Sequence, residues 1–525
     1  MKTRLLQLLL VILVLKLGIL SCKKESLPTV TTTSPSNITD STAVCGGTVI
    51  AEGGTTVTAR GVCWSTYENP TLSDSYTTNS YGLGSYISYI TGLSPKTKYY
   101  VRAYATNSDG TAFGNEFSFN TKSIIISWQK SLGGSSVDKA RYIMQTADGG
   151  YIIAGYSESR DGDVSGNHGD YDYWIVKLAS TGELEWQKSL GGSKDDEAYS
   201  IQQTIDGGYI IAGYSESMDG DVSGNHGDYD YWIVKLTSTG ELDWQKSIGE
   251  RSDDRAYSIQ QTTDGGFIIA GNSSLYFPSY YGIDKEYNCW IVKLTSILEI
   301  EWEKSFGCIG CFFCSSVHQA SDEGYIIVGL SMDDHTFYSD VDYQIMKLTS
   351  TGEFEWERLF GGSVHDYARS FQQTDDGGYI TAGYSNSDDG DVTGNYRDYD
   401  FWIVKLTSNF ELDWQKSLGG SDDDEAYSIQ QTIDGGYIIA GLSSSNDGDV
   451  KGNHGGSDYW IVKLTSDGEI VWQKTFGGCD DDEAYSIQQT IDGGYIIAGY
   501  SNSDDGDVTG NHGDYDFWIV KIHEE

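Results

Sequence analysis

A tryptophan recurs at a nearly constant interval through most of this chain, and this period limits the possible folds more than any other feature. Successive copies lie 58, 58, 58, 54, 58 and 58 residues apart, at Trp128, Trp186, Trp244, Trp302, Trp356, Trp414 and Trp472. Repeats of this length build solenoids, propellers or arrays, in which each unit buries its apolar face against the next. We therefore expect most of the chain to be one unit copied seven times.

The stretch from Asp195 to Gly249 shows what one unit contains. It holds four short apolar runs, AYSIQQT, GYIIAGYS, YWIVKLT and ELDWQKS, which are separated by Asp-Gly-Gly, an Asp/Gly/Asn-rich loop, Thr-Gly and a Gly-Gly turn with acids. Strand-length runs rich in Ile, Val, Tyr and Trp between turn formers predict a four-stranded antiparallel meander. Seven such units predict an all-β fold with a seven-bladed β-propeller over residues 123–525.

The two ends of the array predict how the ring closes. The array begins at Ser123 with only the tryptophan strand, and it ends after Ile522 without one. Each of the four strand types occurs once per blade only if the first strand completes the last blade. This closure also removes exposed sheet edges.

The first 22 residues have the pattern of an export signal, with Lys2 and Arg4 before an apolar run and Cys22 at the end. This end resembles a bacterial lipobox, and the Lys-Lys-Glu-Ser that follows, in a linker over residues 23–27, is similar to the start of many Bacteroidetes lipoproteins. The resemblance implies cleavage before Cys22, lipidation of its thiol and a stable membrane anchor in a bacterial outer membrane lipoprotein, on the periplasmic or the cell-surface side. An ordinary signal peptide with an incidental cysteine is the alternative.

The charge of the chain excludes several classes of partner. It has 34 basic and 77 acidic residues, a net charge of −43. Nucleic acid and anionic lipid head groups are repelled by such a protein. We expect a monomer with neutral or cationic partners, which include a protein, a glycan or divalent cations.

Residues 28–122 contain no copy of the repeat. Their second half carries Leu93-Ser-Pro95-Lys-Thr97-Lys-Tyr99, then Asn107, Gly110, Gly114 and Phe117-Ser-Phe119. This order resembles a fibronectin type III domain, and the resemblance implies a β-sandwich in which Tyr99 makes the tyrosine-corner hydrogen bond. We expect this domain to be a spacer, with direct binding as the alternative.

A second resemblance concerns the strand that carries the tryptophan. The string Lys-Leu-Thr-Ser-Thr239-Gly240-Glu-Leu-Asp-Trp244 is similar to the docking motif of quinoprotein-like propellers, and the whole repeat resembles uncharacterised propeller repeats of exported Bacteroidetes proteins. The first resemblance implies that the tryptophans pack between blades, and it implies no quinone chemistry.

The cysteines offer two sets of disulfide candidates. Cys45 and Cys63 flank Gly53-Gly54, so a hairpin there would bring them level, and two reduced buried thiols are the alternative. Cys308, Cys311 and Cys314 form a Cys-x-x-Cys-x-x-Cys string, with Cys289 one strand away. Local disulfides, such as one that involves Cys308 or Cys314, are favoured there over an iron–sulfur cluster or zinc, because a fourth ligand at motif distance is missing.

The long acidic loop of the repeat is a candidate calcium site. It places hard oxygens at positions 1, 3, 5 and 12 and glycine at 6, which is how an EF-hand loop supplies them. The four copies are Asp161, Asp163, Ser165 and Asp172; Asp219, Asp221, Ser223 and Asp230; Asp389, Asp391, Thr393 and Asp400; Asp505, Asp507, Thr509 and Asp516. The same residues also build metal-free Asx-turns, so calcium is one of two hypotheses for these loops. No other cofactor is expected.

The third repeat replaces this loop with exposed aromatic residues. They are Tyr276, Phe277, Tyr280, Tyr281 and Tyr287. Such a group predicts a binding patch for sugar or protein, and relaxed drift in a redundant blade is the alternative.

The sequence favours a binding protein over an enzyme. It has no Gly-x-Ser-x-Gly elbow, no His-Glu-x-x-His and no phosphate loop. Near-identical blades give no carboxylate pair two different environments, which acid–base catalysis requires. The expected function is therefore a lipid-anchored extracytoplasmic binding, adhesion or scaffold protein that presents an acidic propeller face to a protein or glycan. The alternatives are a polysaccharide-acting hydrolase or lyase with its site over the funnel near blades 3 and 4, and a purely structural spacer.

Overall fold

The computed structural model describes residues 26–279, 282–307, 312–332 and 341–525. These residues form strands and turns only, so the prediction of an all-β protein is confirmed for them. No helix among them is long and apolar enough to cross a membrane. The chain divides into two compact units, residues 1–123 with Glu525, and residues 124–524. The signal segment with Cys22 lies outside the described residues.

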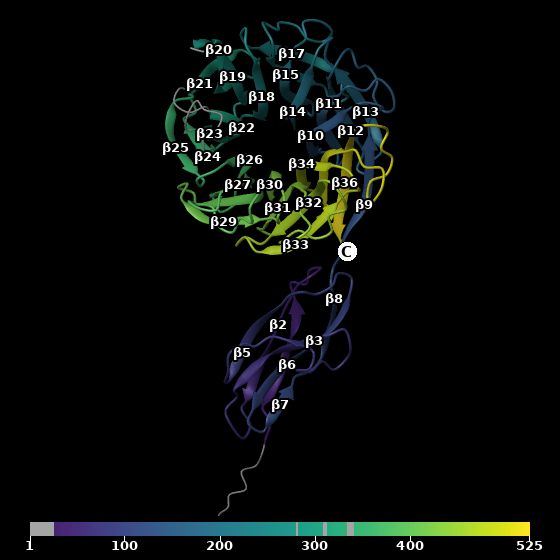
Figure 1. Ribbon diagram of the computed structural model, residues 1–525, viewed down its shortest axis with the longest axis vertical. Helices are drawn as coiled ribbons and strands as arrows, with labels where there is room; N and C mark the ends of the chain where they lie inside the picture. Colours follow the sequence, from purple (N-terminus) through teal and green to yellow (C-terminus); the bar gives the residue numbers. More distant parts are fainter. Residues whose placement is uncertain (1–25, 280–281, 308–311, 333–340) are drawn as a thin grey trace, which may run out of the picture. The chain divides into compact units, whose positions relative to one another are not determined.

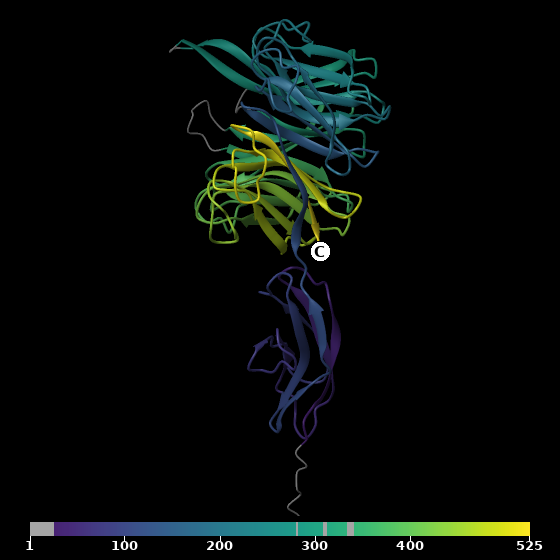
Figure 2. The same cartoon turned by 90° about the vertical axis from the view of Figure 1, so that its right-hand side faces the viewer.

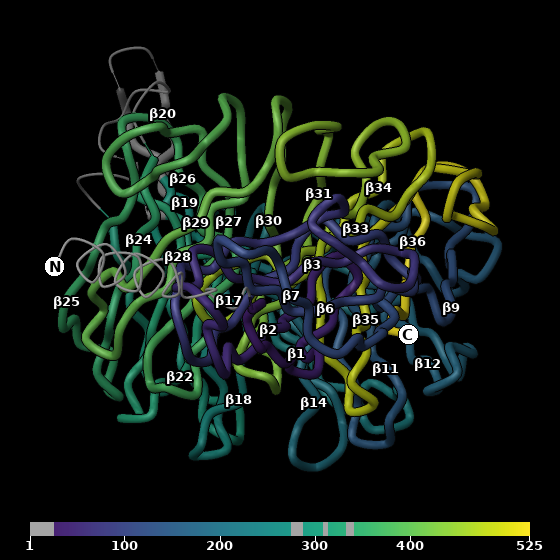
Figure 3. The backbone as a smooth tube through the Cα atoms, turned by 90° about the horizontal axis from the view of Figure 1, so that it is seen from below, coloured from purple at the N-terminus to yellow at the C-terminus, as the bar shows by residue number. Residues whose placement is uncertain are grey.

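The first unit contains two antiparallel sheets, whose backbone Figure 3 traces in purple to blue. One sheet has the order β1-β2-β5, and the other has the order β4-β3-β6-β7 with β8 paired to β6. Buried residues of both sheets share one core, which includes Cys45, Val62 and Val101. The Tyr99 hydroxyl accepts a hydrogen bond from the Ser94 N–H at 3.0 Å. The strands are β1 (Thr29–Ser36), β2 (Ala43–Ala51), β3 (Ala59–Ser65), β4 (Ser75–Tyr76), β5 (Gly84–Ile90), β6 (Lys98–Asn107), β7 (Gly110–Phe113) and β8 (Phe117–Asn120).

The predicted disulfide between Cys45 and Cys63 is wrong. Both thiols are free and buried, and burial raises their pKa values to about 11 and about 12. The Gly53-Gly54 turn does not close a hairpin, because β2 pairs with β1 and β5 while β3 pairs with β4 and β6. The two cysteines therefore lie in different sheets.

The second unit consists of repeated four-stranded antiparallel sheets, a β-propeller repeat fold, and the sheets stand in a ring in Figure 1. We number the sheets first to seventh along the chain. The first has β10 (Asp138–Gln145), β11 (Tyr151–Ser157), β12 (Asp172–Leu178) and β13 (Leu184–Leu190); the second β14 (Asp196–Gln203), β15 (Tyr209–Ser215), β16 (Asp230–Leu236) and β17 (Leu242–Ile248); the third β18 (Asp254–Gln261), β19 (Phe267–Ser279), β20 (Gly282–Leu294) and β21 (Ile300–Phe306). The fourth has β22 (Phe312–Gln319), β23 (Tyr325–Met332), β24 (Val341–Leu348) and β25 (Phe354–Phe360); the fifth β26 (Asp366–Gln373), β27 (Tyr379–Ser385), β28 (Asp400–Leu406) and β29 (Leu412–Leu418); the sixth β30 (Asp424–Gln431), β31 (Tyr437–Ser443), β32 (Asp458–Leu464) and β33 (Ile470–Phe476); the seventh β34 (Asp482–Gln489), β35 (Tyr495–Ser501), β36 (Asp516–Glu524) and β9 (Ile124–Leu132).

The pattern of each run follows from its place in the sheet. The second and third strands, such as β15 and β16, are buried at every residue, because a neighbouring sheet covers each of their faces. They therefore read as continuous apolar runs without alternation. The outer strand β17 has exposed and half-buried residues, and the inner strand β14 alternates between buried and half-buried positions.

The beginning of the second unit is linked to the seventh sheet in two ways. β9 pairs with β36 from Phe517–Leu132 to Glu524–Ile124, so that the blue strand runs beside the yellow one in Figure 2. In addition, the Ile143 N–H in the first sheet donates to the Ser486 hydroxyl in the seventh at 3.2 Å. The same serine–amide bond joins the second sheet to the third, where Ile259 donates to Ser200 at 3.3 Å.

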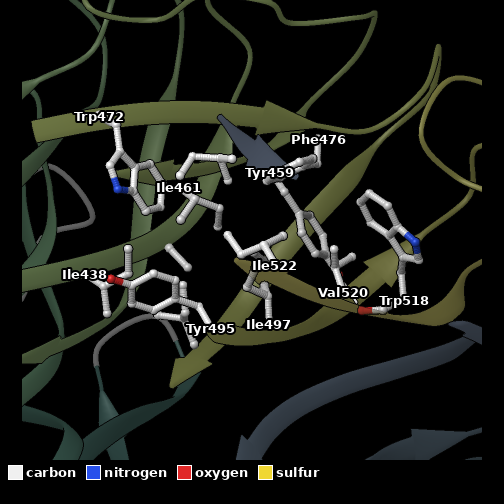
Figure 4. Packing of buried hydrophobic residues seen from close by; sticks show 14 of the residues in the cluster. Ile438, Tyr459, Ile461, Trp472, Phe476, Tyr495, Ile497, Trp518, Val520 and Ile522 are labelled. Carbon is white, nitrogen blue, oxygen red and sulfur yellow. Dashed lines mark hydrogen bonds between the residues drawn. The ribbon is translucent and has the colours of Figure 1, made fainter. Parts of the chain in front are cut away.

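Apolar cores lie between neighbouring sheets. Figure 4 shows the core between the sixth and seventh sheets, where Trp472 and Trp518 enclose Tyr459, Tyr495 and several isoleucines. The ring of an outer-strand tryptophan also lies against the Thr-Gly turn of the next sheet: a Cβ on Gly240 would come within 2.9 Å of the Trp186 ring. These tryptophans are therefore part of the packing between sheets.

Candidate functional site

Each inner strand carries a β-bulge near its start, and the bulged residue lines a central channel of 780 Å³. In the second sheet, Ala198 pairs with Gly213 and Ser200 with Ala212, which leaves Tyr199 without a cross-strand partner. A bulge changes the direction of a side chain, here toward the channel. The seven bulged residues are Arg141, Tyr199, Tyr257, Ser315, Arg369, Tyr427 and Tyr485.

The residues around the bulge are small for a physical reason. Ala198 is fully buried, and a Cβ on Gly213 would lie 1.9 Å from the carbonyl oxygen of Glu197. Only glycine lets the two strands approach this closely. The repeat therefore keeps alanine and glycine at these positions, whereas the side chain that enters the channel is free to vary.

The serine and glutamine side chains that follow the bulge residues along the inner strands connect neighbouring sheets. In the second, third, fifth, sixth and seventh sheets, the serine after the bulge accepts an N–H of the next sheet, as in the bond from Ile259 to Ser200 at 3.3 Å. In the same five sheets the glutamine two residues later does the same, as in the bond from Gln261 N to Gln202 Oε1 at 2.6 Å. These polar side chains hold neighbouring sheets together, so the variable mouth of the channel is the better candidate for a ligand.

Basic side chains lie over aromatic rings at this mouth. The Arg141 guanidinium lies over four tyrosine rings, with its Cζ 4.3 Å from the centroid of Tyr485 and 5.3 Å from that of Tyr199. The Lys139 Nζ lies 4.0 Å and 4.3 Å from the centroids of Tyr500 and Tyr515. Cation–π contacts of this kind hold the basic groups in place without an ion pair.

The carboxylates of the mouth bond to tyrosines. The Tyr199 hydroxyl donates to Glu197 at 3.1 Å, and the Tyr500 and Tyr485 hydroxyls donate to Glu483 at 2.6 and 3.0 Å. Burial raises the pKa of Glu197, and the hydroxyl bonds and the charge of Arg141 oppose that rise.

Below the acidic loops, a pair of aspartates lies at six of the seven junctions between neighbouring sheets, and all of these aspartates except the half-buried Asp342 are buried. Between the first and second sheets, a Cβ on Gly191 would lie 2.5 Å from Asp196 Oδ2 and 2.7 Å from Asp172 Oδ1, so only glycine fits between the two carboxyl groups. Asp196 Oδ2 accepts the Gly192 N–H and the Ser217 hydroxyl, whereas Asp172 Oδ1 has no partner among the described residues. The pairs are Asp172–Asp196, Asp230–Asp254, Asp342–Asp366, Asp400–Asp424, Asp458–Asp482 and Asp516–Asp138.

The exception is the junction of the third and fourth sheets. Asn288 and Phe312 occupy the positions of the two aspartates there, and a disulfide joins Cys289 of β20 to Cys314 of β22. The prediction that Cys314 forms a disulfide is confirmed, and its partner is Cys289, which lies 25 residues away in the preceding sheet. Cys308 and Cys311 lie outside the described residues.

The four predicted calcium-binding residues of each acidic loop bond to different parts of the protein. In the first loop, Asp161 Oδ1 accepts the Ser135 N–H at 2.8 Å, Asp163 Oδ2 accepts the Gly133 N–H at 3.4 Å, and the Ser165 hydroxyl bonds to Gln187. Asp172, at the start of β12, is buried and accepts the His168 N–H at 2.8 Å. Among the described residues, no group of three or more His, Cys, Asp or Glu side chains is arranged to hold a metal ion.

The other three copies repeat this arrangement. Backbone N–H groups donate to the first aspartate, and the twelfth residue is buried at the start of its strand. The loops therefore tie each sheet to the inter-sheet turn beside it. The residues are Asp219, Asp221, Ser223 and Asp230; Asp389, Asp391, Thr393 and Asp400; Asp505, Asp507, Thr509 and Asp516.

From this geometry we expect calcium to leave the stability of the protein unchanged. The loop carboxylates already accept protein N–H groups, so binding calcium would require those bonds to break. The melting temperature of residues 28–525 is measured with 5 mM EDTA and with about 5 mM CaCl₂, since a ligand of the folded state must raise it. A saturable rise of several degrees would show that the loops rearrange around the ion.

The predicted aromatic patch of the third repeat is described only in part. The side chains of Tyr276, Phe277, Tyr280 and Tyr281 lie outside the described part of the structure. Tyr287 is half-buried, and its ring lies 5.3 Å from that of Phe313 at the channel mouth.

The sequence carried one signal for the channel mouth that the strand pattern alone does not reveal. Five of the seven inner strands begin with the string Ala-x-Ser, and the exceptions are Ala-Arg-Tyr in the first sheet and Cys-Ser-Ser in the fourth. The middle residue of the string changes between Arg, Tyr and Ser among the seven copies. A variable position inside an otherwise constant strand indicates a side chain that the scaffold does not use.

Comparison with known proteins identifies relatives in fold but no family. No protein-family profile matches the chain. A segment of 187 residues is 27% identical to the regulatory protein FlaEY of Caulobacter vibrioides; it covers 33% of this chain and 18% of that protein, so the chain spans less than a fifth of its length. The Pan2 WD40 domain of Neurospora crassa is a similar solved structure, with 10% identity over 74% of this chain and 95% of that one and a TM-score of 0.41. An apocarotenoid oxygenase mutant of Synechocystis has 9% identity over 73% and 85% and a TM-score of 0.38. A puromycin hydrolase has 11% identity over 77% and 57% and a TM-score of 0.34.

Proposed function

We propose that the chain is a lipid-anchored, extracytoplasmic binding protein that holds a protein or glycan partner at the mouth of its central channel. In this proposal the seven sheets are the blades of one closed propeller, and residues 28–122 are a fibronectin type III-like spacer between it and the lipid on Cys22. The protein acts as a monomer and without a cofactor.

One observation carries this proposal. Seven bulges direct four tyrosines, two arginines and one serine into one channel of 780 Å³. A scaffold without a ligand has no use for this variation, because the serine and glutamine rings below already join the sheets. Tyrosine and arginine are also the side chains that contribute most to binding surfaces.

Array binding of two matched variants tests the site. Residues 28–525 are applied to neutral glycan and peptide arrays, together with Tyr427→Ala in the channel mouth and Tyr396→Ala on an acidic loop, where the Tyr396 side chain is 47% exposed. We expect Tyr427→Ala to lose about tenfold or more in affinity for any captured partner, and Tyr396→Ala to bind like the wild type. The reverse result would place the binding site on the loops instead.

The membrane anchor is tested separately. In the native host, Cys22→Ala should move the protein from the membrane fraction to the soluble or secreted fraction, because a lipidated cysteine is the only anchor in this proposal. Palmitate labelling of the wild type, and its absence in the variant, checks the chemistry. A Cys22→Ala protein that stays in the membrane fraction would count against lipidation.

An enzyme acting on polysaccharide is the second candidate, and one observation favours it. Glu197 and Glu483 flank Arg141 in neighbouring sheets, and burial raises the pKa of Glu197, as a general acid requires. These residues belong to the first, second and seventh sheets and not to the region near the third and fourth. Release of reducing ends that Glu197→Gln abolishes would support this alternative.

A further inference from the structure

The first sheet departs from the other six at one position in the channel, directly after its bulge residue. Its bulge residue is Arg141, and the next residue is Tyr142, where every other sheet has serine (Ser200, Ser258, Ser316, Ser370, Ser428 and Ser486). Tyr142 lines the channel and is 40% exposed, although it is a large aromatic residue. The first sheet thereby lacks the serine hydroxyl that accepts an N–H of the next sheet elsewhere. The exchange costs the scaffold a hydrogen bond and places an aromatic ring in the channel.

Beside this ring lies an unused hydrogen-bond donor. Arg141 Nε is buried and has no partner among the described residues, while a terminal nitrogen of its guanidinium donates to the Tyr156 hydroxyl at 2.9 Å. A buried donor without an acceptor is costly unless a ligand supplies one. The Tyr199 and Tyr485 hydroxyls, which line the same channel, already donate to Glu197 and Glu483, so their lone pairs remain for a ligand's donor.

We propose that Arg141 and Tyr142 form a subsite for one sugar ring of a neutral saccharide, which stacks on Tyr142 while its hydroxyls bond to Arg141 and the neighbouring tyrosines. This proposal rests on the channel mouth being the binding site. A sugar ring matches the site because it has an apolar face and hydroxyls that both donate and accept. Glu197 and Glu483 lie on either side of Arg141, in a chain of net charge −43, so an anionic ligand is disfavoured.

The repeat itself supplies the test variants. Tyr142→Ser installs the residue of all six other sheets, and Arg141→Tyr installs the residue of four of them. Both variants should fold, because each recreates a channel wall that the protein already contains. Arg358→Tyr on the outer strand β25 is the matched control, because this arginine is exposed and far along the sheet from β22.

Binding of neutral trisaccharides (glucose, mannose, galactose and xylose series), of trigalacturonic acid and of an uncharged tripeptide is measured by calorimetry and ligand-observed NMR. We expect at least one neutral trisaccharide to bind, Tyr142→Ser and Arg141→Tyr to weaken it tenfold or more, and Arg358→Tyr to leave it unchanged. Melting curves confirm that each variant is folded.

Three results would overturn the inference. Tighter binding of trigalacturonic acid than of every neutral saccharide, or binding of the tripeptide alone, would refute the neutral saccharide while leaving a binding function in place. Neutral saccharide binding that survives both variants would refute the subsite. Absence of binding by every probe and on the arrays described above would refute the binding function itself.

Discussion

The free energy of unfolding should fall as the pH rises from about 5 to 8, which is unusual for so acidic a protein. The pKa of Asp196 is raised to about 7, chiefly by burial and also by the negative charge of Asp172. Hydrogen bonds to its carboxylate oppose this rise. Burial likewise raises the pKa of Asp172 to about 6. Asp400, Asp424 and Asp482 reach about 7 in the same way. All exceed the ordinary aspartate pKa of 3.8, so the folded state holds protons that the unfolded state releases.

The sign of this effect follows from linkage. A carboxyl group with a raised pKa contributes stability below pH 3.8, and that contribution is lost as the pH rises through 6 to 7. On the opposite face, a hydrogen bond from Thr204 is the largest cause that lowers the pKa of Asp206 to about 2, and Lys235 also contributes. The stability that Asp206 contributes is present above pH 3.8 and is lost only as the pH falls toward 2. Stability should therefore be highest near pH 4.

Unfolding by urea at pH 4 to 8 and constant ionic strength measures this curve. One pKa unit corresponds to about 1.4 kcal/mol, shared within each pair, so the loss over the five pairs in which both aspartates have a raised pKa should reach several kcal/mol. Asp196→Asn should raise the free energy of unfolding at pH 8, because it removes one of two buried charges. The same change should make the fall of the free energy of unfolding between pH 5 and 8 less steep. Asp206→Asn should instead weaken the protein at pH 5 and leave the slope from pH 5 to 8 unchanged. Stability that is flat or rises from pH 5 to 8 would contradict the raised pKa values.

Removal of the disulfide should cost about 3 kcal/mol, because the bond closes a loop of 25 residues. The junction that it spans keeps the serine and glutamine bonds of the repeat, from Val317 N to Ser258 at 3.2 Å and from Gln319 N to Gln260 at 2.7 Å, but it lacks two other contacts. At the junction of the first and second sheets, the Tyr173 hydroxyl donates to the Trp232 carbonyl at 2.8 Å, but Cys289 occupies the tyrosine's position in the third sheet. The aspartate pair is missing there too, as Asn288 and Phe312 show.

The repeat again supplies conservative variants. Cys314→Ala installs the alanine of the six other sheets and should lower the free energy of unfolding by about 3 kcal/mol, while Cys479→Ser, on an exposed free thiol, should have no effect. Cys289→Tyr with Cys314→Ala should recover part of the loss by restoring the hydroxyl bond. Dithiothreitol should destabilise the wild type and leave Cys314→Ala unchanged. Equal stability of wild type and Cys314→Ala would mean that the junction needs no covalent bond.

The strands of the second unit could be predicted from the sequence because local rules determine them. Runs such as YIIAGYS and YWIVKLT between glycine turns favour a buried β-strand, and they form β15 and β16 as expected. Repetition strengthened the pattern, because each copy tests the interpretation of the others.

The candidate site could not be predicted in the same way, because it depends on which residues lose or gain neighbours from other sheets. The bulge at Tyr199 exists because Ala198 meets Gly213 across the strands. The bond between Cys289 and Cys314 depends on contact between two sheets, and the separation of Cys45 from Cys63 depends on β2 and β3 joining different sheets. None of these contacts is encoded by spacing along the chain.

The location of a bound partner tests the central claim most directly. A crystal structure of residues 28–525 with whichever partner the arrays capture should show ligand density in the 780 Å³ channel, in contact with the bulge residues Arg141, Tyr199, Tyr427 or Tyr485. Density on the acidic loops around residues 161–172, or on the first unit, with an empty channel, would contradict the account.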